Sequence, residues 1–408
     1  MSKYVIIGNS AGAIGCVEGI RSIDKDGEIT LISSEPHHTY SRPLISYLLY
    51  GKTDEQRMKY RPDSFYKDNK VKKMLGKTVV SVDKNAKKVV LSDGKEVLYE
   101  KLMVATGSAP FVPPMDGLDN VKKKFSFMTL DDAHKLEKAI TPQSKVLIVG
   151  AGLIGLKCAE GINDKVESIT VVDLADRILP SILDSEGSAV VQEHIESKGV
   201  KFYLSDSVKA FEKNKATLVS GAEIDFDILV LAVGVRPCVS LIADIGGKVN
   251  RGIVTNERCE TSVKDIYAAG DCTESHDVSS DADKVMALLP NAYMQGETAG
   301  INMAGGDAAY DHAIPMNAIG FFGLHIITAG TYDGECYACS EDGSYKKLFY
   351  KSNRLKGYIM IGDVKRAGIY TSLIKKRTPL SSIDFDLIKE KPQLMAFSQK
   401  ARKEFLAK

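Results

Sequence analysis

Long apolar runs are missing from this sequence. No segment approaches the roughly 20 apolar residues that a membrane-spanning helix needs, and no basic stretch precedes an apolar core near residue 1. An excess of charge of one sign is missing as well, because 54 basic residues face 53 acidic ones and the formal net charge is +1. These absences predict a cytoplasmic protein with no membrane segment and no general affinity for nucleic acid.

Cysteines are few and form no framework. The seven cysteines lie scattered at positions 16, 158, 238, 259, 272, 336 and 339, as is typical of a reducing compartment. Cys336 and Cys339 form one C-x-x-C, but neither a second pair nor nearby histidines complete a zinc site. The pair also does not follow the strand of a βαβ unit, as a thioredoxin-like motif would. We interpret both as ordinary thiols and predict no metal site.

Size and composition favour an α/β protein of more than one domain. A chain of 408 residues exceeds one ordinary domain, so two or three are expected. The hydrophobic content of 44% and the 34 glycines are typical of strands and helices joined by many tight turns.

The stretch YVIIGNSAGAIG at residues 4–15 predicts a strand, a glycine-rich turn and a helix that continues to about Arg21. The first N–H groups and the dipole of such a helix can bind a pyrophosphate. The three positions of the G-x-G-x-x-G fingerprint hold Gly8, Ser10 and Ala13, which is an imperfect match. On this turn alone, a glycine-rich helix start without a ligand stays open.

An acidic residue strengthens the dinucleotide interpretation. Glu35 follows the next apolar strand, at residues 29–32, where its carboxylate can accept hydrogen bonds from ribose hydroxyls. A β-meander is predicted at residues 78–82, 89–91 and 97–99, and a central strand at 102–105. That strand ends in Ala-Thr-Gly, whose small side chains let backbone approach a ligand closely.

The same unit occurs a second time. KVLIVGAGLIG at residues 145–155 carries an intact fingerprint at Gly150, Gly152 and Gly155. Asp173 ends the next strand, close to the roughly 20-residue offset expected after a dinucleotide turn. A return strand at 228–233 then ends at Gly234. Two such units in register are a much stronger signal than one fingerprint alone.

These stretches resemble the two-dinucleotide flavoproteins of the pyridine nucleotide–disulfide oxidoreductase superfamily. The matching segments, in the order of that family, are GNSAGA at 8–13, ATG at 105–107, GAGLIG at 150–155, AVGVRP at 232–237 and AAGDC at 268–272. The resemblance implies FAD on the first unit and NAD(H) on the second. It implies an α/β fold of two Rossmann-like dinucleotide-binding domains with β-meander inserts, plus a small α+β C-terminal domain.

The resemblance also implies domain limits and binding residues. The FAD-binding domain is expected at 1–111 and 236–311, the NAD(H)-binding domain at 112–235, and an interface domain with a helical tail at 312–408. The residues expected to bind FAD are Gly8, Ser10, Ala11, Gly12, Ala13, Glu35, Arg42, Pro43, Val79, Ala105, Thr106, Gly107, Gly270, Asp271 and Asn291. Those expected to bind the nicotinamide nucleotide are Gly150, Gly152, Leu153, Ile154, Gly155, Asp173 and Gly234.

The segment YSRPLIS at residues 40–46 contains no cysteine. Disulfide exchange requires a thiolate, so that chemistry is excluded on this face and no side chain is expected to be redox-active. The segment is similar instead to the subgroup of NADH:rubredoxin reductases, ferredoxin reductases and the flavin part of nitrite reductases. In that subgroup a basic residue and the following proline, here Arg42 and Pro43, lie against the flavin.

The choice of nicotinamide rests on two side chains. Asp173 favours NAD(H), because a carboxylate suits a ribose 2′-hydroxyl and repels a 2′-phosphate, whereas Arg177 weakens that preference slightly. Many relatives carry Glu at the position of Lys157, so the contact on the nicotinamide side stays open, although Glu160 lies one helical turn further.

The resemblance implies hydride transfer from NADH to flavin N5 and one-electron steps to an acidic carrier protein such as a rubredoxin or ferredoxin. Between residues 351 and 380, eight basic residues face one acidic residue, and this region is a candidate docking face. A solvated face or a subunit contact is the alternative, and a homo-oligomer stays open. A peroxide-forming NADH oxidase, and a flavin subunit of a larger complex such as a nitrite reductase or a carbon-oxidising enzyme, also stay open.

Overall fold

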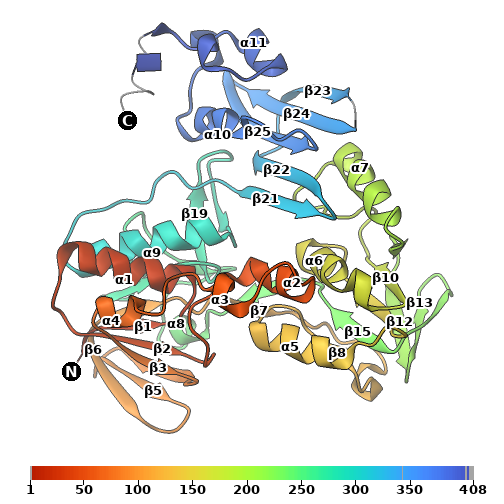
Figure 1. Ribbon diagram of the computed structural model, residues 1–408. Helices are drawn as coiled ribbons and strands as arrows, with labels where there is room; N and C mark the ends of the chain where they lie inside the picture. The colour runs from red at the N-terminus through yellow and green to blue at the C-terminus, as the bar shows by residue number, and fades with distance from the viewer. Residues whose placement is uncertain (1, 342, 400–401, 404–408) are drawn as a thin grey trace. The chain divides into compact units, whose positions relative to one another are not determined.

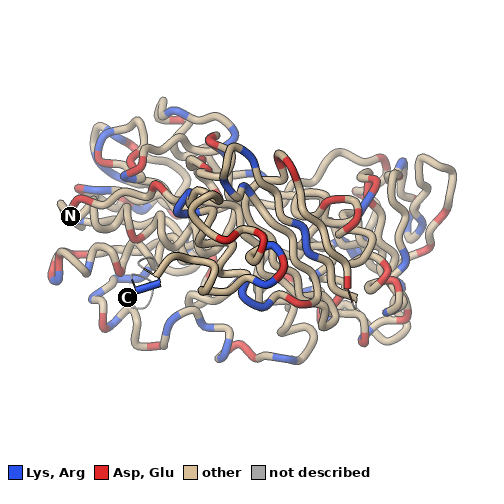
Figure 2. Tube along the Cα trace, turned by 90° about the horizontal axis from the view of Figure 1, so that it is seen from above, with Lys and Arg blue, Asp and Glu red and all other residues tan. Residues whose placement is uncertain are grey.

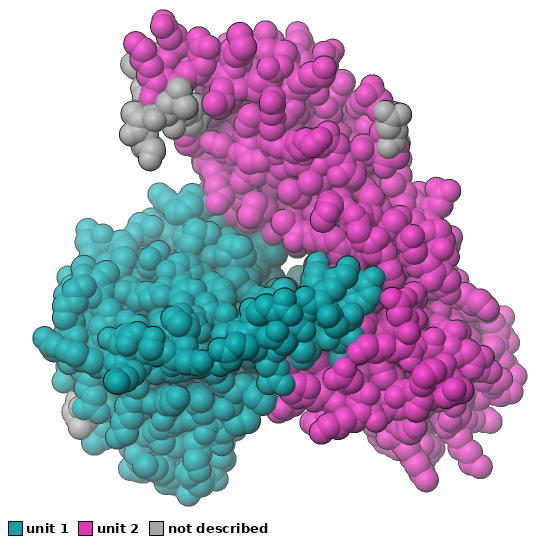
Figure 3. Space-filling model, in the orientation of Figure 1, with its two compact units in different colours: residues 1–111, 235–277, 282–313 teal, residues 112–234, 278–281, 314–408 magenta. Residues whose placement is uncertain are grey.

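The computed structural model describes residues 2–341, 343–399 and 402–403. The chain forms two compact units (Figure 3). Unit 1 contains residues 1–111, 235–277 and 282–313, and unit 2 contains residues 112–234, 278–281 and 314–408. The finer division of unit 2 into a nucleotide-binding part and a C-terminal domain stays a proposal.

Unit 1 is built on a seven-stranded sheet (Figure 1). Its strands lie in the order β3 (Val71–Leu75), β2 (Ile29–Ser33), β1 (Ser2–Ile7), β6 (Glu96–Val104), β5 (Lys88–Leu91) and β4 (Val79–Asp83), and β18 (Ile266–Ala268) also pairs with β6. The pairs from β3 to β6 and the β18–β6 pair are parallel, whereas β4–β5 and β5–β6 are antiparallel. The central strand β1 is buried along almost its whole length, as parallel strands covered on both faces are.

One long strand replaces two that the sequence predicts separately. The third meander strand, expected at 97–99, and the central strand, expected at 102–105, are both parts of β6. Its first half pairs with β5 and its second half with β1, through Ile7 opposite Val104. Polar residues in the middle of β6 interrupt the apolar pattern, which is why the pattern indicates two strands.

Helices α1 (Ala11–Ile23) and α9 (Leu289–Met303) lie side by side in unit 1 (Figure 1). Their contact is made by glycines on both helices. A Cβ placed on Gly15 would lie 2.9 Å from the Glu297 nitrogen, and one on Gly300 would lie 2.8 Å from the Ile20 nitrogen. The two backbones are therefore in direct contact, and no larger residue fits at these positions.

Smaller elements complete unit 1. A two-stranded antiparallel pair joins β7 (Ser108–Pro110) to β16 (Val235–Pro237). The other elements are β17 (Ile253–Val254), β19 (Thr273–Asp277), β20 (Ala282–Val285), the 3-10 helix Arg42–Leu44, α2 (Ile45–Leu49), α3 (Glu55–Met58), α4 (Phe65–Asp68) and α8 (Ser240–Ala243).

The first part of unit 2 repeats the dinucleotide-binding architecture. A parallel sheet has the order β11 (Lys201–Tyr203), β10 (Ser168–Val172), β9 (Lys145–Val149), β15 (Ile228–Leu231) and β8 (Lys124–Phe125). Helices α5 (Leu130–Ala139), α6 (Leu153–Ile162) and α7 (Ser185–Glu196) accompany it, and β12 (Val208–Glu212), β13 (Lys215–Leu218) and β14 (Glu223–Asp225) form an antiparallel meander. The predicted pair of α/β units is thereby confirmed.

The C-terminal part of unit 2 is an antiparallel sheet of β21 (Met316–Phe321), β22 (Leu324–Gly330), β25 (Arg354–Ile361), β24 (Ser344–Lys351) and β23 (Glu335–Glu341). Helices α10 (Ala367–Lys375) and α11 (Phe385–Glu390) pack in one apolar cluster with side chains of this sheet. Val278, at the tip of the β19–β20 hairpin, joins the same cluster. The predicted helical tail lies partly outside the described residues, and a 3-10 helix forms at Leu394–Ala396.

The contact between the glycines of α1 and α9 predicts that adding one methyl group to a contact glycine destabilises the protein. A Cβ on Gly296 would overlap the Gly12 carbonyl oxygen and lie 2.7 Å from its carbonyl carbon. We expect Gly296→Ala to destabilise the protein by about 1–3 kcal/mol, because neither backbone can move away freely. Denaturant unfolding followed by circular dichroism measures this change.

The matched control for this prediction is Gly368→Ala in α10, where a built Cβ meets no atom within 4 Å. It should leave stability unchanged or raise it slightly, because alanine is the better helix former. Equal stability of Gly296→Ala and the parent protein would show that α1 and α9 are not in backbone contact.

Candidate functional site

The first glycine turn brings the carboxyl ends of two strands together. Gly8 has φ +122°, and a Cβ there would lie 3.0 Å from the carbonyl carbon of Ala105. Ser10 is the N-cap residue of α1, but its side chain makes no capping hydrogen bond. The Ser10 side chain therefore leaves the first N–H groups of α1 uncapped. Free N–H groups of this kind are what a helix end needs to bind an anion.

Segments far apart in the sequence meet at this turn. A Cβ on Gly12 would lie 3.3 Å from the Ala292 oxygen and 3.6 Å from the Ala269 oxygen. Gly270, with φ +87°, would place a Cβ 3.5 Å from the Ala292 side chain. Gly12 of the turn therefore lies close to three other segments: the end of β6, the AAGD segment at residues 268–271 and the start of α9.

The residues after β6 are held by the return of the chain into unit 1. Thr106 donates its hydroxyl hydrogen bond to the Cys238 carbonyl at 2.8 Å, and the Cys238 N–H donates to the Gly107 carbonyl at 2.9 Å. Gly107 adopts φ +66°. Ala11 and Ala13 are buried in the first turn of α1.

Glu35 and Arg42, both expected at the flavin, contact each other. Arg42 forms an ion pair with Glu35, and the Tyr40 hydroxyl donates to Glu35 Oε2 at 2.6 Å. Pro43 follows within a 3-10 helix and is exposed. The side chain of Val79 packs in the apolar cluster that contains Val5, and its contact with the cofactor stays a prediction.

Asp271 and Asn291 lie at the other side of the turn. Burial raises the pKa of the Asp271 carboxyl, although the positive charge of Arg42 and a hydrogen bond from Ser108 act in the opposite direction. Asn291, in the first turn of α9, accepts a hydrogen bond from the buried Tyr310 hydroxyl at 2.8 Å. Gln295, which the sequence did not indicate, accepts from the Gly270 N–H at 2.8 Å.

A second group that the sequence did not indicate surrounds Thr39. The Thr39 N–H donates to the Tyr66 hydroxyl at 3.1 Å, which donates to Asn9 Oδ1 at 2.8 Å, and the Asn9 amide donates to the His37 carbonyl at 3.1 Å. The Thr39 hydroxyl is buried and has no hydrogen-bond partner among the described residues. An unpaired buried hydroxyl beside a glycine turn fits a site where a bound dinucleotide supplies the missing partner.

The second glycine turn repeats this arrangement in unit 2. Gly150 has φ +118°, and a Cβ there would lie 2.6 Å from the carbonyl carbon of Ala232. Gly152 is the N-cap of α6, and a Cβ there would meet open space. Gly155 contacts the Gly150 carbonyl, while Leu153 and Ile154 form the first turn of α6 and are half-buried.

Asp173 lies beside this second turn. Its Oδ2 accepts from the Ala151 N–H at 2.6 Å and its Oδ1 from the Ala175 N–H at 2.8 Å. Arg177 pairs with Asp176 at 2.8 Å, and its buried Nε has no partner among the described residues. Gly234, after β15, adopts φ +122° and is exposed.

Lys157 and Glu160 form a buried ion pair on α6. Lys157 Nζ also donates to the Gly320 carbonyl at 3.1 Å, and Glu160 Oε1 accepts from the Phe322 N–H at 2.7 Å. His194 of α7 contacts the Phe322 carbonyl at 3.2 Å. These three side chains therefore hold the turn of the β21–β22 hairpin against the two helices.

Two glycine turns, each between a parallel strand and an uncapped helix, define a protein with two dinucleotide-binding folds. Residues 2–296 match the pyridine nucleotide-disulphide oxidoreductase family, and residues 315–378 match the rubredoxin NAD+ reductase C-terminal domain. The chain belongs to the pyridine nucleotide–disulphide oxidoreductase family, as predicted.

Among similar proteins is the NADH-dependent phenylglyoxylate dehydrogenase subunit epsilon of Aromatoleum evansii, 30% identical over 94% of this chain and 93% of that protein. The NADH-rubredoxin oxidoreductase of Clostridium acetobutylicum is 29% identical over 89% of this chain and 92% of its own length. The nitrite reductase of Bacillus subtilis matches 93% of this chain, which spans only 48% of that protein.

Solved structures support the same fold. The crystal structure of the covalent putidaredoxin reductase–putidaredoxin complex matches 100% of this chain and 98% of that chain with a TM-score of 0.87 at 22% identity. The chain is an oxidoreductase that binds FAD and NAD(H), which confirms the predicted cofactors. No helix in the described part of the chain is long and apolar enough to cross a membrane.

The buried Lys157–Glu160 ion pair predicts that the effects of substituting its two residues on the free energy of unfolding are not additive. Lys157→Met leaves the Glu160 carboxylate buried without its cation, and we expect a loss of about 3 kcal/mol in the free energy of unfolding. Adding Glu160→Gln removes the charge but keeps an oxygen that can accept from Phe322, so the double variant should be more stable than Lys157→Met alone. Denaturant titrations of the variants test this, and a double variant less stable than Lys157→Met would contradict it.

The charge of Arg42 predicts a titration shift at Asp271. Because Arg42 lowers the pKa of that carboxyl, Arg42→Gln should raise it further in the flavin-free protein. The raised pKa means that stability falls as pH increases from the unfolded value of about 3.9 through the folded value. Carbon-13 NMR titration of the Asp271 carboxyl measures the shift, with Arg57→Gln, whose partner is the exposed Asp54, as the control. An unchanged or lower pKa in Arg42→Gln would refute the coupling.

Proposed function

We propose that this protein transfers electrons between NAD(H) and a one-electron carrier protein through FAD. The observation that carries the proposal is the pairing of two dinucleotide-binding folds with a first site that lacks a reactive thiol. Cys272 lies next to Asp271, but burial raises its pKa to about 11, and burial raises the pKa of Cys16 in α1 as well. Burial also raises the pKa of Cys238, which contacts Thr106 and Gly107. None of these thiols supplies the thiolate that disulfide chemistry requires.

The residues of the first turn are proposed to bind FAD. The uncapped N–H groups at the start of α1, at Ala11 and Gly12, bind the pyrophosphate, and Glu35 accepts from ribose hydroxyls. The amino-terminal end of α9, at Asn291, is directed at the flavin edge where negative charge collects on reduction. When bound, FAD supplies the exchange between a two-electron donor and one-electron acceptors.

The residues of the second turn are proposed to bind NAD(H). The start of α6 receives the pyrophosphate, and Asp173 accepts from the 2′-hydroxyl of the adenosine ribose. Its present hydrogen bonds to Ala151 and Ala175 hold the carboxylate at the turn. A 2′-phosphate would be repelled there, so NADH is preferred over NADPH.

The carrier is proposed to dock on the basic region at residues 351–377. Basic and acidic residues are both scattered over the whole trace (Figure 2), and several cations of this region already have partners. Lys351 pairs with Asp333 at 2.9 Å and Arg377 with Asp281 at 2.6 Å. Arg354 is exposed and forms no ion pair among the described residues, so it is available to an acidic partner.

A second candidate function is that of a flavin subunit within a larger redox complex. It is favoured by the similarity, over almost the whole chain, to a protein named as a dehydrogenase subunit. Such a subunit would take electrons from, or give them to, a partner enzyme instead of a free carrier. Co-purification of a stable complex from the native source would favour this candidate.

The test is anaerobic reduction of the purified flavoprotein with NADH, followed by addition of an acidic rubredoxin at low and high salt. We expect rapid reduction of the carrier that slows as salt rises, because exposed charge pairs are screened. Arg354→Gln should slow carrier reduction about threefold at low salt and leave flavin reduction unchanged. Lys67→Gln, an exposed cation on α4, is the matched control.

Other outcomes separate the alternatives. If the flavin is reduced quickly but passes its electrons only to oxygen, the result would contradict the carrier reductase and support an NADH oxidase. A flavin that NADH leaves oxidised would favour the reverse direction, in which a reduced ferredoxin supplies the electrons. A cytoplasmic location stays a proposal that fractionation of cells can test.

A further inference from the structure

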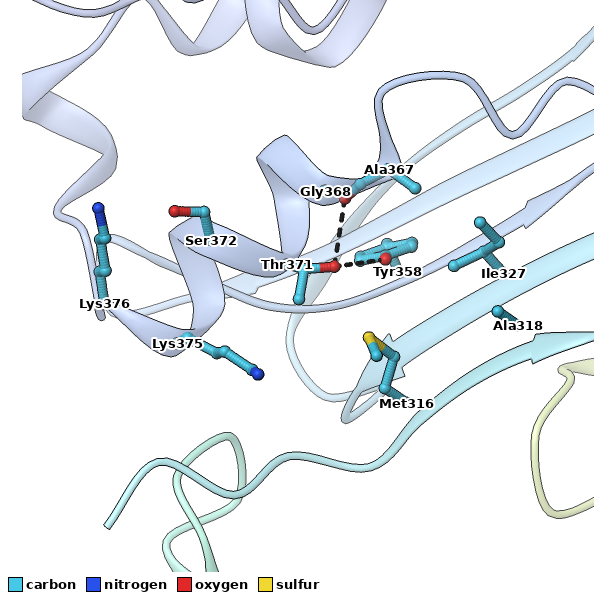
Figure 4. Close-up of a pocket in the computed structure, with 10 residues that line it drawn as sticks. All are labelled: Met316, Ala318, Ile327, Tyr358, Ala367, Gly368, Thr371, Ser372, Lys375 and Lys376. Atoms are coloured by element: carbon cyan, nitrogen blue, oxygen red, sulfur yellow. Dashed lines mark hydrogen bonds between the residues drawn. The ribbon is translucent and has the colours of Figure 1, made fainter. Parts of the chain in front are cut away.

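A cavity of about 520 Å³ lies between helix α10 and the C-terminal sheet (Figure 4). Small-molecule sites in proteins have volumes of roughly 300–1,000 Å³. No residue of either glycine turn lines the cavity, and all its lining residues belong to the C-terminal part of unit 2: Met316, Ala318, Ile327, Tyr358, Ala367, Gly368, Thr371, Ser372, Lys375 and Lys376.

The sheet provides an apolar floor. Ala318 of β21 is paired with Ile327 of β22, so both side chains lie on the same face of the sheet. Met316 lies two residues before Ala318 and therefore on that face too. The short side chain of Ala318, between these larger residues, leaves the space open.

Helix α10 provides a roof whose chemistry changes along its length. Positions 367, 371 and 375, and positions 368, 372 and 376, are spaced by four and line one helical face. The first pair is Ala and Gly, the second Thr and Ser, and the third Lys and Lys. The Thr371 hydroxyl is already bonded to the Tyr358 hydroxyl at 2.7 Å, as Figure 4 shows. The cavity is thus apolar at one end and cationic at the other.

The charge of Lys375 distinguishes this end from the rest of the basic region. Lys351, Lys365 and Arg377 each lie within 4.0 Å of an acidic side chain. Lys375 is half-buried and forms no ion pair within the described ranges. A partly desolvated ammonium at the end of an apolar cavity favours an anionic group there.

We propose that this cavity binds a small organic carboxylate with an apolar body. The body lies between Ala318, Ile327 and α10, and the carboxylate pairs with Lys375. A neutral apolar molecule would leave the ammonium without a counter-charge, and a small inorganic anion would leave the apolar floor uncovered. The proposal goes beyond the electron-transfer function and does not depend on it.

The test is isothermal titration calorimetry of the FAD-loaded protein with octanoate and, as a matched neutral ligand, octanol. We expect octanoate to bind about threefold more tightly than octanol, a ratio within the range measured for one charge pair near a surface. Lys375→Gln should remove that preference and leave octanol binding unchanged. Lys365→Gln, which precedes α10 and does not line the cavity, should behave like the parent protein.

A cavity-filling variant gives an independent check. Ala318→Phe should abolish binding of both ligands, and circular dichroism shows whether it folds. If it does not fold, the Lys375 comparison decides alone. Absence of octanoate binding at millimolar concentration, equal affinity for octanol, or unchanged octanoate affinity in Lys375→Gln would each overturn the proposal. The rate of flavin reduction by NADH, measured in the same samples, should be the same in these variants as in the parent protein. A failure of the ligand-binding proposal can therefore be told apart from a failure of the electron-transfer proposal.

Discussion

The direct backbone contact between α1 and α9 is the constraint on which the first dinucleotide site depends. Gly12, Gly15 and Gly19 on one helix face Gly296 and Gly300 on the other. Two helices whose contact face consists of glycines approach until their backbones touch. This approach brings the amino-terminal ends of both helices, which are more than 270 residues apart in sequence, to the same glycine turn. The positive ends of two helix dipoles therefore meet at this turn.

The two glycine turns have the same backbone arrangement but different neighbouring side chains. In each, a glycine with positive φ lies against the end of the returning strand, at Ala105 in unit 1 and at Ala232 in unit 2. The first turn is surrounded by charged and polar residues from several distant segments, including Arg42 and Asp271. The second is held mainly by Asp173, which accepts from backbone N–H groups beside the turn.

The C-terminal sheet uses its two faces for different purposes. One face packs against α10 and α11 and contains the cavity described above. On the other face, Tyr345 and Lys347 reach Asp184 at the start of α7, each at 2.8 Å. The hairpin turn at Phe322 is held by Glu160 and His194. The nucleotide-binding helices and the C-terminal sheet are thus joined by polar contacts at buried or half-buried positions, where such contacts contribute more than on the surface.

Local pattern was sufficient for the strands, the glycine turns and the order of segments, because these strand–turn–helix connections need glycine where φ lies near +120°, as at Gly8 and Gly150. It was also sufficient to show that the segment at residues 40–46 offers no thiol, since that depends only on residue identity. The sequence could not join the two halves of β6, because a polar stretch in the middle of a strand is indistinguishable from a turn.

Side-chain partners were decided only by the tertiary structure. Glu35 and Arg42 were each expected at the flavin, but that they contact each other depends on how the chain folds after β2. The sequence left the contact of Lys157 open, and two of its partners in the structure are Glu160, on the same helix, and the Gly320 carbonyl, more than 160 positions away. The packing of the Val79 side chain against Val5 and its neighbours likewise follows from the folded meander. Short-range pattern determines backbone shape, whereas partners distant in sequence are chosen by packing that only the folded chain defines.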